Sequence, residues 1–455
     1  MQNLHAPPFC ISRYDAFKVW LRVAALSFGG PASQIAVMHR ILVDEKKWIS
    51  EVRFLHALNY CMLLPGPEAQ QLATYIGWLM HRTAGGLMAG LLFIAPGYVA
   101  IMALSILYAG YGNVPWVAAA FFGLKAAILA VVVEAVVRIG TRALKNNVMV
   151  AIAIVAFVGI FFFAVPFPVV VLTAAAFGIV AHAATPHLLP ALAKPKSTDS
   201  TMAVLDRAIA TGELRHIEPN ATRAIKTALL WLVIWLTPVA TCMIWLGPGH
   251  VFTTLSTFFS KVAVVTFGGA YAVLAYVGQQ AVDLYGWLGP REMLDGLALA
   301  ETTPGPLIMV LQFVGYLAAY RADLSISPLL AGILGSTLTV WVTFAPSFLW
   351  IFAGGPYVEA LLGRRWLHAA LSCITAAVVG VILNLSVWFA IHVMFSKVED
   401  RTFGALHLSV PDWPSVDVAA VLISAASMLA ILRFHIGVGT TLAAAAAAGF
   451  LWKFF

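Results

Sequence analysis

The sequence is built around RVAALSFGG at residues 22–30 and PGP at residues 65–67. The same pattern returns as KVAVVTFGG at residues 261–269 and PGP at residues 304–306. One offset of 239 residues, without a gap, aligns the basic residue, the FGG, a tryptophan (Trp48 with Trp287) and the PGP of the two copies. Chance could supply either tripeptide alone but hardly both at the same separation, so the chain contains an internal repeat.

Composition places the chain among membrane proteins. Hydrophobic residues make up 61% of its 455 residues and charged residues only 10%, whereas soluble domains carry about 25% charged residues. So little polar surface predicts an all-α polytopic membrane protein embedded in a lipid bilayer. The net charge of +7 is typical of basic cytoplasmic loops or of a protein that handles anions. The basic residues are scattered, which argues against a nucleic-acid partner.

Nothing in the sequence indicates an enzyme. It contains no HExxH pair, zinc-ligand spacing, phosphate-binding loop or nucleophile elbow. The four cysteines are isolated and predict neither a disulfide framework nor a metal site. We therefore expect no catalytic residues, no metal and no cofactor.

Apolar runs divide the chain into four parts. Residues 1–184 hold the first repeat with about six spans, and residues 185–225 form a polar cytoplasmic linker. Residues 226–395 hold an extra span and the second repeat, and residues 396–455 hold two C-terminal spans. Counting each FGG helix and each PGP stretch as one span predicts about 13 transmembrane spans. FGG then falls in the first and the eighth span, which predicts two repeats of inverted topology.

Basic loops predict a cytoplasmic N-terminus. Arg138, Arg142, Lys145 and the linker all fall on the inside of this scheme. The run at residues 40–53 carries four basic residues and falls outside. It is the main observation against the inverted arrangement.

Glycine and proline break both repeats where a straight helix would otherwise continue. Proline removes a backbone donor and clashes with the preceding turn, so each PGP predicts two half-helices that meet. Transporters with inverted repeats bind substrate at such broken helices near mid-membrane. The alternative is that glycine and proline only permit close helix packing. The residues of these breaks belong to the predicted substrate-binding site. They are Phe28, Gly29, Gly30, Pro65, Gly66, Pro67, Phe267, Gly268, Gly269, Pro304, Gly305 and Pro306.

Three basic residues are predicted to lie inside the membrane and to bind the substrate. Arg22 and Lys261 occupy equivalent positions six residues before FGG, roughly 12–15 Å along their helices. A charge at that depth costs about 2.5–3.5 kcal/mol and usually has a function, and two cations facing a cavity would favour an anion. Snorkelling to the interface is the alternative. Lys125 lies at a similar depth, while Glu134 is expected to pair with Arg138 one turn later.

Polar residues next to the PGP breaks complete the candidate site. Glu68 directly follows the first PGP and is either a helix-start acid that favours the dipole or a proton-coupling group; Gln71 is a further coupling candidate. Thr302 and Thr303 precede the second PGP. Their hydroxyls could bind an oxyanion or could bond their own helix carbonyls.

The two copies of this pattern resemble the chromate ion transporter family, in its long two-domain bacterial form. The most specific runs are Leu64-Pro65-Gly66-Pro67-Glu68-Ala69-Gln70-Gln71-Leu72-Ala73 and Glu301-Thr302-Thr303-Pro304-Gly305-Pro306, and the resemblance covers about residues 15–140 and 255–395. One departure follows FGG, where Pro31 and Ala270 occupy the position at which a third glycine or another small residue is expected.

This resemblance implies a multi-pass carrier of the bacterial inner (plasma) membrane that moves chromate outward and confers chromate resistance, with sulfate as the related anion. The alternative is a sulfate or other anion permease, and an integral-membrane enzyme is disfavoured. A second copy of the chain, in a homodimer, is a candidate partner. The residues do not separate chromate from sulfate, since both are tetrahedral dianions, and they do not set the coupling ion or the direction of transport.

Overall fold

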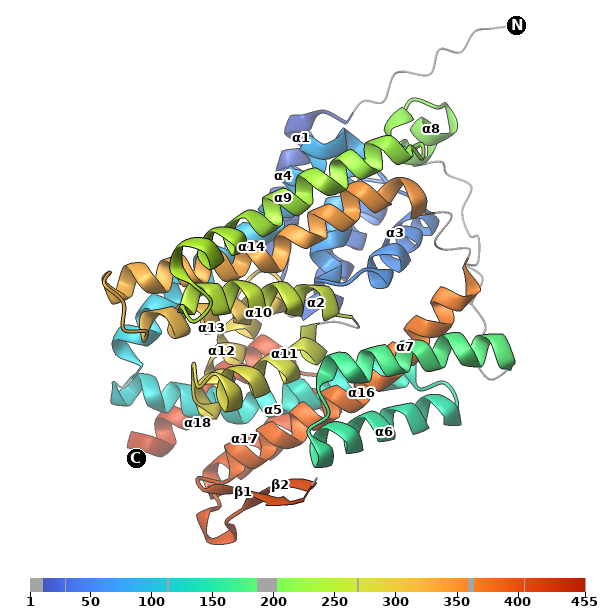
Figure 1. The fold of residues 1–455 in the computed structure, drawn as a ribbon. Coiled ribbons are helices and arrows are strands. Elements are labelled where there is room, and N and C mark those ends of the chain that lie inside the picture. Colours follow the sequence, from blue (N-terminus) through green and yellow to red (C-terminus); the bar gives the residue numbers. More distant parts are fainter. Residues whose placement is uncertain are drawn as a thin grey trace, which may run out of the picture.

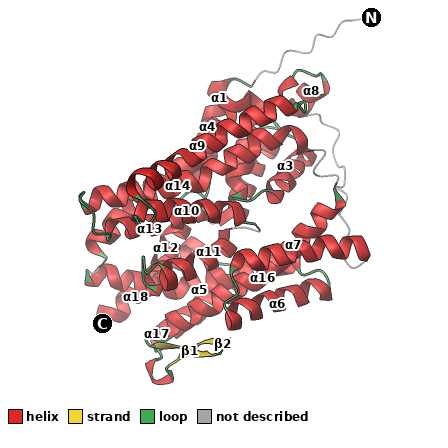
Figure 2. Cartoon of the chain, viewed as in Figure 1, coloured by secondary structure: helices red, strands yellow, loops and turns green. Residues whose placement is uncertain are grey.

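The structure is a computed structural model that describes residues 11–28, 30–112, 114–185, 203–267, 270–358, 364–404 and 406–454. The predicted site residues Gly29, Gly268 and Gly269 lie outside these ranges. Within them, regular structure is helical apart from one two-stranded hairpin (Figure 1, Figure 2). The predicted all-α class therefore holds for the body of the molecule.

The first repeat begins with short helices and continues with longer ones. The side chains of Ser12 and Ser50 accept the backbone N–H groups of Asp15 and Arg53, and so begin two of the short helices. The helices of this part are α1 (Arg13–Leu26), α2 (Gly30–His39) with a π-helical turn η1 (Arg40–Glu45), α3 (Glu51–Leu63), α4 (Glu68–Tyr111), α5 (Pro115–Ala143), α6 (Asn147–Phe163) and α7 (Phe167–Ala184).

The second repeat follows the linker and an extra helix, and its helices come in the same order as those of the first repeat. The linker contains α8 (Val204–Ala210) and η3 (Arg215–Ile217), and the extra helix is α9 (Ala221–Leu246). The elements that follow are α10 (Val251–Val265), α11 (Ala270–Gln279), η4 (Gln280–Leu284), α12 (Pro290–Thr302), η5 (Leu307–Met309), α13 (Val310–Tyr320), α14 (Pro328–Gly354), η6 (Gly355–Tyr357), α16 (Arg365–Met394), β1 (Val398–Phe403), β2 (Leu406–Pro411), η7 (Trp413–Ser415), α17 (Val418–Met428), η8 (Leu429–Arg433) and α18 (Val438–Phe454).

Equivalent positions make equivalent backbone bonds at the ends of α2 and α11. The N–H of Trp48 donates to the carbonyl of Leu42 at 2.9 Å, and the N–H of Trp287 donates to the carbonyl of Ala281 at 2.8 Å. Both pairs are related by the 239-residue offset. The two repeats therefore share a π-helical turn as well as the FGG and PGP breaks.

Helix α4 is two antiparallel arms and not one straight helix. The backbone leaves the helical region at His81 and Arg82, where Arg82 has φ 55°. The arms pack so closely that a Cβ at Gly77 would lie 2.5 Å from the carbonyl oxygen of Gly85. In the second repeat α13 and α14 form the same hairpin, since a Cβ at Gly335 would lie 2.7 Å from the carbonyl oxygen of Gly315.

Hydrogen bonds place the outer ends of the first-repeat half-helices together. A ring nitrogen of His81, after the first arm of α4, bonds the carbonyl of Ile11, just before α1, at 2.8 Å. The linker bonds the same region: the N–H of Leu205 donates to the carbonyl of Trp48 at 2.9 Å, and His216 bonds the carbonyl of Trp78 at 3.0 Å. Burial lowers the pKa of this linker histidine.

These contacts correct one assumption of the sequence analysis. The start of α1, the end of η1, the start of α3 and the end of the first arm of α4 lie at one end of the molecule, beside α8 (Figure 1). Each broken stretch of the first repeat therefore returns to the end where it began, whereas the count of about 13 treated each as a single crossing. The described part of the chain contains six helices long and apolar enough to cross a membrane, along with shorter apolar ones.

The C-terminal part contains an element that the sequence analysis did not expect. Strands β1 and β2 pair antiparallel from Val398 opposite Pro411 to Phe403 opposite Leu406. The hairpin lies between α16 and α17, at the edge of the helical body (Figure 1).

The two repeats exchange helix pairs. Helices α6 and α7, which follow α5 in the sequence, pack against α16 of the second repeat. Helices α17 and α18, which follow α16, pack against α5 of the first repeat, and α5 and α16 also contact each other. The halves are therefore interlocked.

Candidate functional site

The FGG and PGP breaks of the two repeats are joined by a reciprocal pair of backbone hydrogen bonds. The N–H of Gly66 donates to the carbonyl of Thr266, the residue before the second FGG, at 2.8 Å. The N–H of Gly305 donates to the carbonyl of Ser27, the residue before the first FGG, also at 2.8 Å. Both pairs of residues are related by the 239-residue offset. All four breaks therefore meet in one place.

Glycine is required at both PGP positions. Gly66 has φ +124° and Gly305 has φ +105°, a region that L side chains rarely adopt. A Cβ at Gly305 would also lie 2.9 Å from the Cα of Gly97, and one at Gly66 would lie 2.6 Å from the side-chain nitrogen of Gln71. Backbone conformation therefore disfavours a larger residue at both positions, and at Gly305 the close approach of the Gly97 backbone adds to this.

A small cavity, here called the central cavity, lies between the breaks, at the point where four helices begin. Its lining comes from the first turns of α2, α4, α11 and the η5–α13 segment, with the residues before two of them: Pro31, Gln34, Pro67, Glu68, Ala69, Ala270, Pro306, Leu307 and Ile308. Eight of these residues form four pairs at the 239-residue offset, such as Pro31 with Ala270 and Pro67 with Pro306. The two repeats thus line the cavity in an equivalent way.

The start of a helix attracts negative charge. Its first N–H groups have no partner within the helix, and its dipole places a partial positive charge there. Four helices that begin at one cavity therefore form a surface suited to an anion. The cavity offers about 20 Å³ to the centre of a water molecule, which is room for about one water.

Two buried amide side chains hold the PGP carbonyls. The amide nitrogen of Gln34 donates to the carbonyl of Gly305 at 2.5 Å. The amide nitrogen of the predicted residue Gln71 donates to the carbonyl of Pro65 at 2.7 Å. Gln34 was not predicted from the sequence, although a glutamine four residues after FGG in a mostly apolar segment is a signal that could have found it.

Glu68 is the charged residue among those that line the cavity. Within the described part of the chain it forms no ion pair, and its equivalent in the second repeat is Leu307. The predicted residues Thr302 and Thr303 donate their hydroxyls to carbonyls of their own helix, at 3.0 Å to Ala298 and 3.3 Å to Ala300. The cavity therefore carries a carboxyl group on one side only.

The structure does not bring Arg22 and Lys261 to this cavity. Arg22 forms an ion pair with Glu45 at 2.5 Å, with its side chain half exposed. Lys261 is exposed on α10. Phe28 is 45% exposed, and Phe267 is partly buried against the core. A role for these residues in substrate binding stays a prediction.

Lys125 already has a buried partner. Its Nζ lies 3.3 Å from Oδ1 of Asp295, whose other oxygen accepts the hydroxyl of Tyr108 at 2.7 Å. Asp295 was not predicted from the sequence, because nothing local to α12 reveals a partner on α5. The predicted pair of Glu134 and Arg138 is confirmed, at 3.4 Å.

The sequence profile named "Chromate transporter" matches residues 14–179 and 253–450. The chain belongs to the chromate transporter family. It is 32% identical to a chromate transport protein of Pseudomonas aeruginosa, over 83% of this chain and 81% of the relative. It is 27% identical to a chromate transport protein of Cupriavidus metallidurans, over 80% of this chain and 79% of that relative.

A probable chromate transport protein of Synechococcus elongatus is 24% identical, over 83% of this chain and 84% of that protein. No solved structure matches. The matches and the apolar helices make this a multi-pass membrane transport protein.

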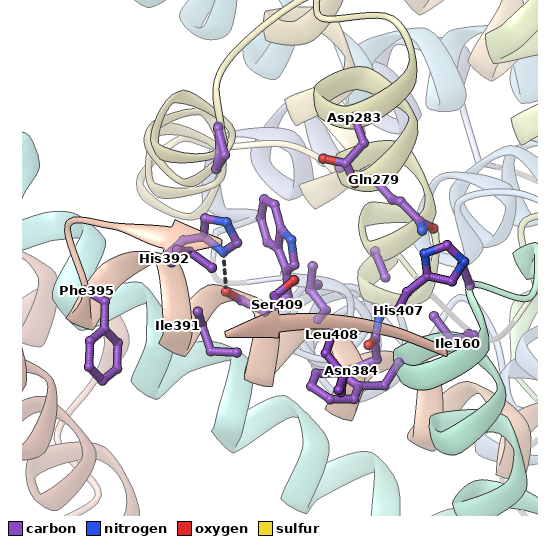
Figure 3. Close-up of a pocket in the computed structure, with 18 of the residues that line it drawn as sticks. Ile160, Gln279, Asp283, Asn384, Ile391, His392, Phe395, His407, Leu408 and Ser409 are labelled. Atoms are coloured by element: carbon purple, nitrogen blue, oxygen red, sulfur yellow. Dashed lines mark hydrogen bonds between the residues drawn. The ribbon is translucent and has the colours of Figure 1, made fainter. Parts of the chain in front are cut away.

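A second and larger cavity of about 710 Å³, here called the hairpin vestibule, lies beside the outer ends of α11 and α12. On one side it is lined by Gln279 and Asp283, and on another by His407, Leu408 and Ser409 of β2, which lies across it (Figure 3). Because α11 begins at the central cavity and ends at the vestibule, and α12 runs in the opposite sense, these two half-helices connect the two spaces.

Proposed function

We propose that the chain is a secondary transporter that carries chromate out of the cell through the central cavity, with sulfate as a related substrate and chromate resistance as the outcome. The observation that carries the proposal is the convergence of four helix starts on a cavity that both repeats line in an equivalent way. The choice of chromate follows the names of the relatives.

The helix starts can supply the affinity that a transported ion needs. Each contributes about 0.3–1 kcal/mol to an anion and about 2 kcal/mol in a partly buried geometry. Four at about 1 kcal/mol each correspond to a Kd of about 1 mM. Hydrogen bonds from backbone N–H groups to the charged oxygens add to this affinity. A dianion can thus be held with no cationic side chain in contact.

The size of the cavity indicates that binding requires movement. Space for one water is too small for a tetrahedral oxyanion, so the half-helices must separate to admit it. The reciprocal bonds from Gly66 to Thr266 and from Gly305 to Ser27 connect each break to the other repeat. Movement of one break is therefore transmitted to the other, which suits alternating access.

Glu68 is proposed to couple transport to protons. Its carboxylate and an oxyanion compete for the same positive helix starts. Protonation of Glu68 removes this competition and allows the dianion to enter. Binding of substrate and binding of a proton then favour each other.

Basic residues support a cytoplasmic position for the N-terminus and the linker, in the inner membrane. The run at residues 40–53 lies at the linker end, because Lys47 and Arg53 contact residues of the linker: the carbonyl of Lys47 accepts the N–H of Val204, and Arg53 pairs with Asp206 at 2.6 Å. The chief objection to the inverted arrangement came from placing this run outside. Because the broken stretches of the first repeat return to the end where they began, the run at residues 40–53 joins the other basic loops on the inside. The hairpin vestibule then opens outward.

The test is uptake and efflux of labelled chromate and sulfate in vesicles of known orientation, with and without a pH gradient. Outward chromate movement accompanied by protons that move in the same direction supports the proposal. A protein that moves sulfate inward and rejects chromate is instead a sulfate permease. Vesicles that move neither anion overturn the assignment of the central cavity.

A further inference from the structure

A second carboxyl group lies close to the breaks and has no role in the scheme above. Glu301 lies in the last turn of α12, and its side chain is buried. Its Oε1 accepts the hydroxyl of Tyr271 at 2.5 Å. Tyr271 is also buried, is the second residue of α11, and follows Ala270, which lines the central cavity.

The break at Pro304-Gly305-Pro306, here called the second break, is closed on one side by this hydrogen bond. The bond joins the first turn of α11 to the last turn of α12. On the other side Gly305 ties the same break to the first repeat, through its N–H to Ser27 and its carbonyl to Gln34. The second break is therefore held by one bond within its own repeat and two bonds across the repeats.

The surroundings of Glu301 hold charges but no ion-pair partner. Apart from Tyr271 of α11, the groups that act on it electrostatically are Glu134 and Arg138 of α5. Those two are paired with each other at 3.4 Å, and within the described residues no cation pairs with Glu301. A carboxyl group of this kind inside a membrane is a typical site for a transported proton.

The pair occurs in one repeat only. The positions equivalent to Glu301 and Tyr271 are Met62 and Ala32, which can neither bind a proton nor form this bond. Conversely, Glu68 of the first repeat is matched by Leu307. Each repeat thus carries one carboxyl group at its PGP, before the break in one repeat and after it in the other.

We propose that Glu301, held by Tyr271, is a proton-binding site that controls separation of α11 from α12. With Glu301 ionised, the Tyr271 hydroxyl donates a charge-assisted hydrogen bond, which is roughly twice as strong as a neutral one. When Glu301 takes up a proton, the pair becomes neutral and the tie weakens, so the second break can open toward the vestibule. The proton leaves again when the break closes. This inference rests on the proposed transport function and adds to it a second proton site.

The experiment uses purified full-length protein in vesicles, with two readouts. Chromate exchange at equal pH on both sides measures binding and movement, and a pH-sensitive dye measures protons moved per chromate. For Glu301→Gln we expect exchange within about twofold of wild type, loss of at least half of the coupled proton movement and a flatter pH profile. Tyr271→Phe keeps the carboxyl group and is expected to shift the pH profile without abolishing coupling. Glu399→Gln, which alters an exposed carboxylate of β1, is the matched control and should behave as wild type.

Three outcomes would overturn the assignment. The first is a Glu301→Gln variant that keeps the wild-type number of protons per chromate, and the second is a Tyr271→Phe variant with an unchanged pH profile. Folded Glu301→Gln protein that binds chromate but exchanges none would give the residue a structural role. A wild-type protein that exchanges no chromate would instead overturn the transport function itself, so the two failures are distinguishable.

Discussion

The Nζ atom of Lys125 lies 3.3 Å from Oδ1 of Asp295, so α5 and α12 are joined by an ion pair inside the helical body. Asp295 is 4% exposed, and its second oxygen accepts the hydroxyl of Tyr108. Each partner neutralises the other, and neither residue lines the central cavity. The pair is therefore expected to maintain the structure first and to serve the substrate only indirectly.

Removing one member of this pair should destabilise the protein strongly. Lys125→Met leaves a buried charge on Asp295, which costs about 3–5 kcal/mol. The double variant Lys125→Met with Asp295→Asn should recover most of that loss. The measurement is the thermal midpoint in detergent, followed by chromate affinity. A stable double variant that has lost chromate binding would restore Lys125 as a substrate ligand.

The PGP glycines should tolerate no side chain. Gly66→Ala and Gly305→Ala force positive φ on a residue with a Cβ, at about 1–2 kcal/mol, and add the close contacts described above. We expect at least tenfold slower chromate exchange from protein that still reaches the membrane. Gly110→Ala is the control, because a Cβ there meets nothing within 4 Å. Equal rates for all three variants would make the breaks packing features only.

Glu68→Gln should remove pH dependence from substrate binding. In the wild type, rising pH ionises Glu68, and its carboxylate then repels the incoming dianion, so chromate affinity falls as pH rises. The glutamine carries no charge at any pH, so its affinity should stay near the low-pH value of the wild type. Binding measured across a pH series checks this. If the variant keeps the wild-type slope, Glu68 is only a helix-start acid.

Arg22 and Lys261 provide a comparison between direct contact and long-range attraction. Direct hydrogen bonds to the anion would make Arg22→Gln or Lys261→Gln ten- to a hundredfold weaker, at about 1.4 kcal/mol per decade. Because Arg22 pairs with Glu45 and Lys261 is exposed, we expect less than about a tenfold loss, which added salt should reduce further. A larger loss in both variants, with normal expression, would mean that these side chains turn inward during transport.

The inverted arrangement can be tested at equivalent turns. Thr83 follows the first arm of α4 near the linker end, whereas Asp323 follows α13 near the opposite end, and both are exposed. In a background without the native cysteines, Thr83→Cys should react with a membrane-impermeant thiol reagent only from the cytoplasm. Asp323→Cys should react only from outside. Labelling of both from one side would contradict the arrangement.

The local breaks could be predicted from the sequence because their cause is local. Proline lacks an N–H and glycine accepts positive φ, so PGP ends a helix whatever surrounds it. The equal spacing gave the internal repeat, and the general plan of transporters with inverted repeats assigned the breaks of both copies to one site. The return of each half-helix to its own end could not be predicted, because that path depends on contacts such as His81 with Ile11, made between distant segments.

Two further features could not be predicted for related reasons. The ion pair of Lys125 with Asp295 joins residues 170 apart in the sequence, so no spacing rule connects them. The hairpin of β1 and β2 is a short polar segment between apolar helices, and its turn depends on Gly404 at φ +64°. A single pattern of alternating residues that short is indistinguishable from a loop.

The exchange of helix pairs between the repeats has a consequence for biosynthesis. Helix α5 leaves the ribosome long before α17 and α18, the helices that pack against it. At about 5–20 residues per second, the roughly 300 residues that separate them take about 15–60 seconds. Throughout that interval the exposed face of α5 must be shielded by lipid or by the insertion machinery, and the faces of α6 and α7 must be shielded until α16 follows. The nascent first half is consequently the stage at which quality-control proteases have their best opportunity to remove the chain.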